Sequence, residues 1–194
     1  LKVEFAWHRY LNIYQKNIDL FIVPSQFVKN KLLENNFPAE KITVIPHFLE
    51  TEFKPKKVNT KLGDYIFAYG RLDESKGFDN LLDAFAEIKI SGLKLLIAGA
   101  GPEKSNLENK IKKINLTKKV QLLGHQNKQE IINLIAGSLF VINCSKVHET
   151  FGLTVLEAMS LQKTVIASNV GAIPELIKTE KNGLLYQAGD AGDL

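Results

Sequence analysis

Cysteine is nearly absent from this chain, since Cys144 is the only one in 194 residues. A single cysteine excludes an intramolecular disulfide and indicates a protein that works in a reducing compartment. His8, His47 and Cys144 do not stand at metal-ligand spacing, and no acidic cluster has the form of a magnesium site. The sequence therefore contains neither a disulfide framework nor the signature of a metal centre.

Long apolar runs are also missing, because no run approaches the roughly 18 residues of a membrane-spanning helix. The opening stretch LKVEFAWHRY lacks the basic-then-apolar order of a signal peptide, so we expect a cytoplasmic protein. The chain carries 25 basic and 21 acidic residues, but its lysines form no dense block with interleaved aromatics. Nucleic acid is therefore not an expected partner, whereas the small positive excess suits a phosphorylated substrate or an anionic membrane surface.

Short runs rich in β-branched and apolar residues recur along the chain and predict six strands: DYIFAYG, LKLLIAG, KVQLLG, LFVINCS, KTVIAS and GLLY. The segments between them carry helical spacing of apolar residues. Apolar strands that alternate with amphipathic helices are typical of a parallel sheet covered on both faces. We therefore predict an α/β protein, with a doubly wound, Rossmann-like domain at residues 64–194.

Residues 1–47 contain one further β-α-β unit, in which Ser25 is the expected N-cap of a helix that runs to about Asn36. Two strands and one helix cannot make a stable sheet alone, so we expect this segment to be the tail of a larger preceding domain. The proline- and lysine-rich stretch at 48–63 predicts an interdomain linker. The final GDAGDL indicates the start of another helix, so the second domain is expected to be truncated.

Two carboxylates eight positions apart, Glu149 and Glu157, lie in the stretch HETFGLTVLEAM after a predicted strand. Ligands of open parallel sheets bind beyond the carboxyl ends of the strands. A helix starting near Gly152 would offer free backbone amides to an anion there, and Glu157 would accept hydrogen bonds from a ligand's hydroxyl groups. The alternative is an ordinary helix with one acid before its first turn and another on its solvated face.

Two cations, Arg71 and Lys76, lie in the stretch GRLDESKGF after another predicted strand, at the same edge of the sheet. The planar fork of an arginine and the point charge of a lysine together suit a diphosphate. The alternative is a solvated loop in which Asp73 and Glu74 neutralise these cations locally. Cations and carboxylates at two neighbouring loops favour a binding site.

Four successive stretches, GRLDESKGF, LLIAGAGPEKSNLE, VQLLGHQNKQEI and HETFGLTVLEAM, resemble motifs of a known family. It is the group 1 family of retaining nucleotide-sugar glycosyltransferases, which includes glycogen synthase and phosphatidylinositol mannosyltransferase-like enzymes. The resemblance spans residues 22–194, and the family's pattern of two glutamates separated by seven residues is complete at Glu149 and Glu157. It implies the GT-B architecture of two Rossmann-like domains, of which this chain resembles the C-terminal, donor-binding one with a remnant of the N-terminal one.

The resemblance implies roles for the cations and for the helix start. Arg71 and Lys76 would hold the donor diphosphate, and the amides of Leu153 and Thr154 would bind a phosphate. These groups would stabilise the leaving diphosphate without a metal, so no metal and no cofactor are expected beyond the nucleoside-diphosphate sugar itself.

The resemblance also separates the two acids. Glu157 would hold the ribose hydroxyls, whereas Glu149, with Phe151 and Gly152 beside it, would face the transferred sugar. Together with Arg71 and Lys76, Glu149 is the expected catalytic group. The donor site is completed by a tight turn and a loop near the base: Gly101, His125 and Gln126. The plainer interpretation of His125 and of Gln126, as residues of a surface loop, is the one that the sequence alone favours.

The chain departs from the family pattern at IPHFLE (45–50), where many relatives have an Asn-Gly turn, and at Gly171-Ala172, where a Gly-Gly pair is common. The missing N-terminal domain would bind the acceptor, a sugar or a lipid-linked glycan, so this fragment is expected to be inactive alone. The full-length protein is expected to be cytoplasmic, with peripheral contact at the inner face of the membrane. The alternatives are a sugar-nucleotide epimerase or hydrolase on the same scaffold and a non-catalytic nucleotide-binding module. Donor base, sugar and acceptor identity are not determined by the residues.

Overall fold

The computed structural model describes residues 11–49, 53–56 and 62–194, and the chain divides into two compact units, Leu1–His47 and Phe48–Leu194. The described part of the first unit has two helices, a 3-10 turn and two parallel strands: α2 (Ile13–Asn17), β1 (Phe21–Val23), α3 (Gln26–Glu34), η1 (Ala39–Lys41) and β2 (Ile42–Val44). The side chain of Ser25 accepts a hydrogen bond from the amide of Val28, so the predicted N-cap of α3 is confirmed.

Burial is sparse in this first unit. Val23 and Ile42 are buried at 5% and 4% exposure, whereas Leu20, Ile22 and Ile45 are 51%, 61% and 51% exposed. A pair of three-residue strands with little to pack on leaves neighbouring apolar side chains in contact with solvent.

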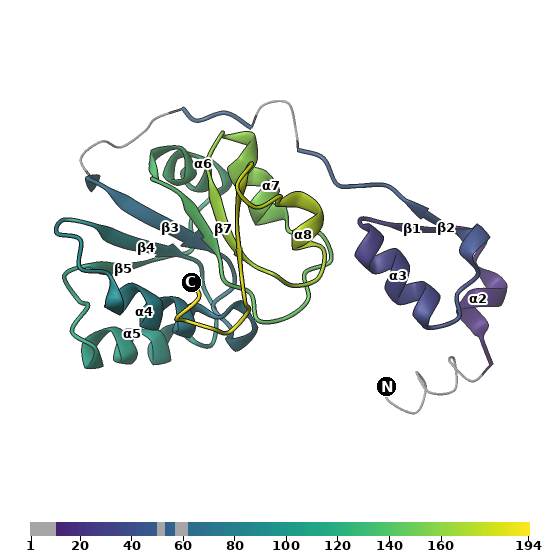
Figure 1. The fold of residues 1–194 in the computed structure, drawn as a ribbon, viewed down its shortest axis with the longest axis horizontal. Coiled ribbons are helices and arrows are strands. Elements are labelled where there is room, and N and C mark those ends of the chain that lie inside the picture. The colour runs from purple at the N-terminus through teal and green to yellow at the C-terminus, as the bar shows by residue number, and fades with distance from the viewer. Residues whose placement is uncertain (1–10, 50–52, 57–61) are drawn as a thin grey trace. The chain divides into compact units, whose positions relative to one another are not determined.

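The second unit is built on a six-stranded sheet in which every pairing is parallel. All six strands predicted from the sequence are present. Its elements, drawn in Figure 1, are β3 (Tyr65–Tyr69), η3 (Glu74–Lys76), α4 (Phe78–Glu87), β4 (Lys94–Ala98), α5 (Lys104–Lys113), β5 (Val120–Gly124), α6 (Lys128–Gly137), β6 (Val141–Asn143), α7 (Leu153–Ser160), β7 (Val165–Ser168), α8 (Ile173–Leu176) and β8 (Gly183–Tyr186).

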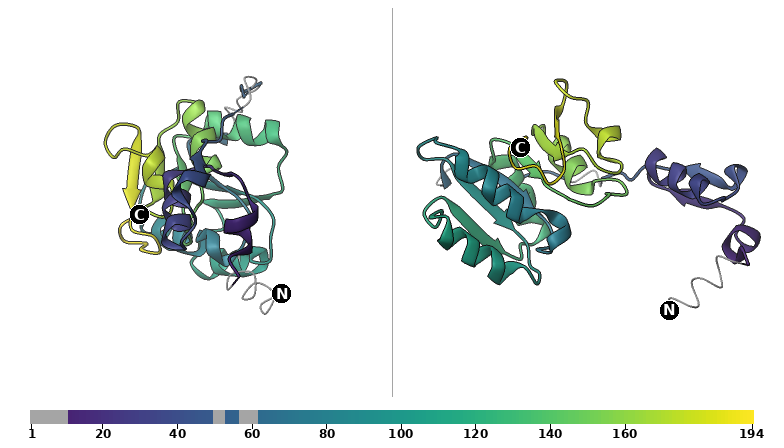
Figure 2. Two further views of the ribbon diagram at one scale, coloured as in Figure 1. Left: turned by 90° about the vertical axis from the view of Figure 1, so that its right-hand side faces the viewer. Right: turned by 60° about the horizontal axis from the view of Figure 1, so that its bottom comes forward.

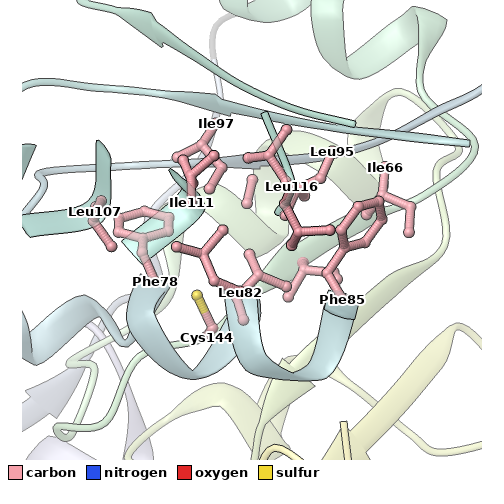
Figure 3. Packing of buried hydrophobic residues seen from close by; sticks show 14 of the residues in the cluster. Ile66, Phe78, Leu82, Phe85, Leu95, Ile97, Leu107, Ile111, Leu116 and Cys144 are labelled. Carbon is pink, nitrogen blue, oxygen red and sulfur yellow. The ribbon is translucent and has the colours of Figure 1, made fainter. Parts of the chain in front are cut away.

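Helices cover both faces of this sheet, as the second view in Figure 2 also shows. On one face, α4 and α5 pack on β3 and β4 through side chains that include Phe85, Leu107 and Ile66 (Figure 3). On the other face, α6, α7 and α8 bury Ile135, Val155 and Ile173 against the sheet. Two separate cores on a parallel sheet confirm the doubly wound α/β fold.

Cys144 belongs to the first of these cores and is 4% exposed (Figure 3). Burial raises the pKa of its thiol to about 12. The lone cysteine is therefore a packing residue, because a thiol that stays protonated at neutral pH is a poor nucleophile and a poor metal ligand.

The strand order, β5-β4-β3-β6-β7-β8, reverses direction between β3 and β6. The chain leaves β3 toward one edge of the sheet and later returns to β6 on the other side of it. The helices that follow these two strands, α4 and α7, pack on opposite faces of the sheet. In open α/β sheets, the ligand crevice lies beyond the carboxyl ends of the strands at such a switch point. The loops after β3 and β6 are those that carry the cations and the carboxylates identified in the sequence.

The described part of the predicted linker packs on the second unit. Phe53 is 8% exposed, the amide of Lys56 donates to Oδ1 of Asn133 at 3.0 Å, and Nε2 of Gln129 donates to the carbonyl of Lys54 at 3.3 Å. Residues 50–52 and 57–61 of that stretch, and residues 1–10 of the predicted N-terminal tail, lie outside the described residues. The assignment of 1–47 to a preceding domain and of 48–63 to a linker stays a prediction.

Candidate functional site

The loops after β3 and β6 are joined to each other by a backbone hydrogen bond. The backbone amide of Lys146 donates to the carbonyl of Ser75 at 2.7 Å, and its ammonium group lies 2.8 Å from Oδ2 of Asp79 at the start of α4. One residue of the β6 loop thus contacts both the β3 loop and the helix that follows it. This connection fixes the two loops against each other.

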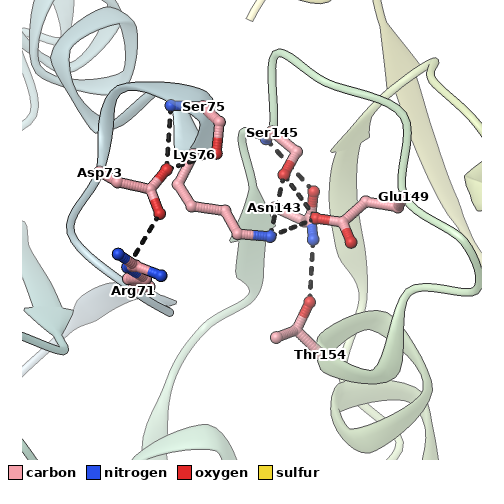
Figure 4. Close-up of polar contacts among 8 residues, drawn as sticks. All are labelled: Arg71, Asp73, Ser75, Lys76, Asn143, Ser145, Glu149 and Thr154. Carbon is pink, nitrogen blue, oxygen red and sulfur yellow. Dashed lines mark hydrogen bonds and ion pairs between the residues drawn. The ribbon is translucent and has the colours of Figure 1, made fainter. Parts of the chain in front are cut away.

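Lys76 and Glu149 meet across these loops (Figure 4). Nζ of Lys76 lies 2.6 Å from Oε1 of Glu149 and 3.4 Å from Oγ of Ser145, and the Ser145 hydroxyl donates to the same carboxylate oxygen. The side chains of Lys76 and Glu149 are 31% and 20% exposed. The pair is therefore partly shielded from solvent but still open to a ligand.

Arg71 has a different environment. Its Nε lies 3.4 Å from Oδ2 of Asp73, and its side chain is 73% exposed. The Ser75 hydroxyl donates to Asp73, and this hydrogen bond is the largest influence that holds the pKa of the Asp73 carboxyl below its usual range. The local neutralisation raised as an alternative thus applies to Arg71, whereas the partner of Lys76 comes from another loop.

The backbone of Glu149 is held by the loop after β7. The amide of Ala172 donates to the carbonyl of Glu149 at 2.8 Å. Gly171 packs so closely on Glu149 that an added Cβ would lie 2.2 Å from its carbonyl oxygen. Glu149 is therefore fixed both at its main chain, by the β7 loop, and at its carboxylate, by Lys76 and Ser145.

Helix α7 begins at Leu153, directly after Gly152, as the sequence predicts. Gly152 has a φ of 94°, a left-handed conformation that favours glycine, and no side chain in the described residues caps the helix. The first amides of α7 are thus not taken by a capping oxygen and are suited to an anion. Phe151 is 6% exposed, so little of it is open to a ligand in this structure.

Glu157, one turn further along α7, lies against the end of β3. The hydroxyl of Tyr69 donates to Oε2 of Glu157 and is 3.2 Å from the carbonyl oxygen of Thr154. Burial raises the pKa of the Glu157 carboxyl, while the Tyr69 hydrogen bond and the positive charge of Lys128 act in the opposite direction. Glu157 therefore lies on the packed side of α7 rather than on the fully solvated face that the alternative interpretation required.

A pocket of about 330 Å³ adjoins Tyr69, at the carboxyl ends of β3, β4 and β5. Arg71, His125 and Gln126 contribute to its lining, and Nε2 of Gln126 donates to the carbonyl of Leu123 at 2.9 Å. Gly101 lies just beyond the lining, against the backbone of Leu72. The predicted site residues thus gather at one edge of the sheet, in two neighbouring groups around Lys76–Glu149 and Tyr69–Glu157.

Three polar residues of this edge were not singled out in the sequence: Tyr69, Asn143 and Ser145. Asn143 is 9% exposed, and its Nδ2 donates to Oγ1 of Thr154 at 2.8 Å, which ties α7 to β6. Each of the three ends or follows a strand that is otherwise apolar. A polar residue at the carboxyl end of a parallel strand was the available signal.

The described residues contain no group of three or more His, Cys, Asp or Glu side chains arranged to hold a metal ion. Within the same residues, no helix is both long and apolar enough to cross a membrane. The expectations of a metal-independent site and of a cytoplasmic location stay predictions.

Comparison with known sequences gives related proteins over most of the chain. An uncharacterized glycosyltransferase of Methanocaldococcus jannaschii is 32% identical over 180 residues, which are 92% of this chain and 48% of that protein. The phosphatidylinositol N-acetylglucosaminyltransferase GPI3 subunit of Saccharomyces cerevisiae is 29% identical over 175 residues, which are 84% of this chain and 38% of that protein. This chain thus spans about half the length, or less, of these relatives.

Comparison with solved structures gives the same architecture. The crystal structure of Anabaena HepE in complex with UDP and glucose matches 94% of this chain and 53% of its own, with a TM-score of 0.86 and 24% identity. At this identity the likeness establishes the fold. The sequence profile of the family described as glycosyl transferases group 1 matches residues 50–194. This chain therefore belongs to the group 1 glycosyl transferases, as its motifs predicted.

Proposed function

We propose that this chain is the donor-binding part of a retaining glycosyltransferase, which binds a nucleoside-diphosphate sugar and passes its glycosyl group to an acceptor. The observation that carries the proposal is the contact of the Lys76 ammonium with the Glu149 carboxylate beside the uncapped start of α7. A cation, a carboxylate and free amides at one edge suit a ligand that has both phosphates and hydroxyl groups. The solved complex of HepE, a protein of the same fold, contains UDP and glucose.

The diphosphate is assigned to the Lys76 side of the crevice. Arg71 is 73% exposed, and its Nε lies 3.4 Å from Asp73, so its guanidinium can turn toward an anion at little cost. The amides of Leu153 and Thr154 add hydrogen bonds, and the dipole of α7 favours negative charge at this end. The Lys76 ammonium binds a phosphate oxygen when that oxygen shares or replaces the contact of the ammonium with Glu149.

The ribose is assigned to Glu157, since an ionised carboxylate accepts hydrogen bonds from neighbouring hydroxyl groups. The base is assigned to the adjoining pocket, beside His125 and Gln126 and near Gly101. The sugar is assigned to Glu149, with the backbone of Phe151 and Gly152 next to it. This order places base, ribose, diphosphate and sugar along the edge from β5 to α7.

In the proposed reaction, the bond between the anomeric carbon and the diphosphate oxygen breaks, and the oxygen of an acceptor hydroxyl forms a new bond on the same face. The proton of that hydroxyl passes to the leaving diphosphate oxygen. Negative charge develops on the diphosphate as it leaves, and positive charge develops on the sugar ring. The negative charge on the diphosphate is stabilised by Lys76, Arg71 and the α7 amides. The positive charge on the sugar ring is stabilised by the Glu149 carboxylate. We propose no metal for this step.

The acceptor, a sugar or a lipid-linked glycan, is assigned to a part of the protein outside these 194 residues, because this chain spans about half of its relatives. We place the full-length protein in the cytoplasm, with peripheral contact at the inner face of the membrane. The chain alone is expected to bind a nucleoside diphosphate without transferring sugar.

The test is a calorimetric titration of UDP, GDP and ADP into the chain, repeated with Lys76→Ala and with Lys110→Ala as a matched control. Lys110 also makes a 2.6 Å ion pair, with Asp83, and its side chain is 27% exposed, but it lies on α5. We expect one of the diphosphates to bind, and Lys76→Ala to weaken it by roughly tenfold, the effect of about one charged hydrogen bond. The loss of affinity in Lys76→Ala should be larger for the diphosphate than for the nucleoside. It should also be larger at low salt, where the charges are less screened.

The control variant is expected to bind like the wild type. The proposal is wrong if none of the three diphosphates binds, or if the two lysine variants lose affinity equally. In the full-length protein, Glu149→Ala should abolish glycosyl transfer, and unchanged transfer would favour the non-catalytic nucleotide-binding module.

A further inference from the structure

Tyr69 links the end of β3 to α7 through contacts with Thr154 and Glu157. Its hydroxyl donates to Oε2 of Glu157 and lies 3.2 Å from the Thr154 carbonyl oxygen. These partners are 85 and 88 positions away along the chain. One hydroxyl therefore contacts both the backbone of the first turn of α7 and the carboxylate of the second.

The Tyr69 ring is itself held in place. It stacks on Phe67 of the same strand, with ring centroids 5.3 Å apart and planes 13° from parallel. Burial raises the pKa of the Tyr69 hydroxyl well above its ordinary value, and the negative charge of Glu157 raises it further. Tyr69 thus stays protonated at neutral pH and remains a donor to the carboxylate.

Two groups from different elements act on the Glu157 carboxylate: the Tyr69 hydroxyl from β3 and the Lys128 ammonium charge from α6. Within the described residues, the tyrosine acts through a hydrogen bond to a defined oxygen, Oε2, and the lysine through its charge. A carboxylate with two oxygens has about four lone-pair sites, so the bond to Oε2 leaves acceptor capacity for ligand hydroxyl groups. The same tyrosine lines the 330 Å³ pocket, next to the ligand space.

We propose that Tyr69 is a positioning residue of the donor site, which orients the Glu157 carboxylate toward the ribose hydroxyls of the nucleotide. The inference rests on the proposed function, because it takes Glu157 as the ribose contact. A carboxylate that is free to rotate would lose side-chain entropy on binding, whereas one held by Tyr69 is already in place. Tyr69 thereby strengthens the preference of the site for a ribonucleotide over its 2′-deoxy form.

The test uses Tyr69→Phe, which removes only the hydroxyl and keeps the ring on Phe67. The control is Tyr65→Phe on the same strand, since the Tyr65 hydroxyl is also bonded, at 2.8 Å to the Leu134 carbonyl, but does not contact Glu157. Carboxyl-detected NMR follows the titration of Glu157 in the free chain. Calorimetry then compares the best-binding ribonucleoside diphosphate with its 2′-deoxy form.

In Tyr69→Phe, we expect the pKa of Glu157 to rise, because the lost hydrogen bond favoured the charged form. We also expect the ratio of ribose to 2′-deoxyribose affinity to fall by about two- to tenfold, the effect of roughly one hydrogen bond. Tyr65→Phe should change neither quantity. Glu157→Gln should lower the same ratio.

The outcomes distinguish a failure of the positioning role of Tyr69 from a failure of the proposed function. An unchanged Glu157 titration in Tyr69→Phe overturns the positioning role without any ligand. A shifted titration with an unchanged affinity ratio also overturns it, while nucleotide binding by the chain stands. If Glu157→Gln leaves the ratio unchanged, Glu157 is not the ribose contact, and if the wild type binds no nucleotide, the proposed function fails together with this inference.

Discussion

The ammonium nitrogen of Lys76 lies 2.6 Å from Oε1 of Glu149, although the two residues are 73 positions apart in the sequence. The contact joins the loop after β3 to the loop after β6 across the switch point of the sheet. The Lys76 ammonium and the Glu149 carboxylate thus form an ion pair in the structure. A diphosphate that enters the site therefore competes with Glu149 for Lys76.

Glu149→Gln is accordingly expected to tighten the binding of a free nucleoside diphosphate by roughly two- to fivefold, the scale of a partly exposed ion pair. The variant removes the carboxylate that competes for Lys76 and also repels the phosphates. The gain should shrink as salt is raised, because the charges are then screened. Calorimetry at two salt concentrations measures it, and weaker binding by the variant would mean that Glu149 orients Lys76 for the phosphate instead.

Glu157→Gln is expected to stabilise the fold at neutral pH while it weakens nucleotide binding. The pKa of Glu157 is raised in the folded chain, mainly by burial. The folded state therefore favours the protonated carboxyl, and the charged form lowers the free energy of unfolding. Glutamine keeps an oxygen that accepts from Tyr69 and has no charge to desolvate. The Tm difference between variant and wild type should shrink as the pH falls through the raised pKa, and vanish below the ordinary value of 4.5. A variant that unfolds more readily than the wild type at pH 7 would contradict this account.

Gly171→Ala is expected to displace Glu149. The new Cβ would lie 2.2 Å from the Glu149 carbonyl oxygen, and the φ of 59° is itself unfavourable for alanine. Gly92→Ala is the matched control, since Gly92 has a φ of 79° but nothing within 4 Å of an added Cβ. Both variants bear the left-handed cost of about 1–2 kcal/mol. Gly171→Ala should lose about 1–3 kcal/mol more to the steric clash, measured by urea unfolding.

The same pair of glycine variants separates stability from function. Gly171→Ala should also weaken the binding of a nucleoside-diphosphate sugar, whereas Gly92→Ala should not. Equal unfolding free energies for the two variants would show that the β7 loop moves away easily and does not hold the backbone of Glu149.

The two units are expected to differ in local stability. β1 and β2 form an isolated parallel pair of three residues each, whereas β3 lies in the middle of six strands with helices on both faces. Amides of the isolated pair should therefore exchange with solvent orders of magnitude faster than those of β3, because little apolar area resists their opening. Hydrogen exchange followed by mass spectrometry measures this difference. Similar protection of β1 and β3 would show that the first unit is stabilised by contacts other than its own small core.

Local patterns in the sequence were sufficient for the six strands of the second unit and for its family, whereas the helix expected to start at GDAGDL is a turn in the structure. Continuous apolar runs such as those of β3 and β4 are buried on both faces, and a strand of that kind needs little context to be predicted. Glu149 and Glu157 were found because a spacing of eight within one segment is a local property. The charged loops were found for the same reason, since each directly follows an apolar strand.

Only the tertiary structure decided which of these groups meet. Lys76 could have paired with the neighbouring Asp73, as Arg71 does, but the parallel order of β3 and β6 brings Glu149 closer to it. Tyr69 carries a polar group at the end of a strand, but no pattern within that segment indicates its partner, and its contact with Glu157 exists because α7 lies against the end of β3. Such contacts depend on the strand order and on how each helix returns to the sheet. The spacing of residues within one segment determines neither the strand order nor the return of each helix, because both arise from packing between segments far apart in the chain.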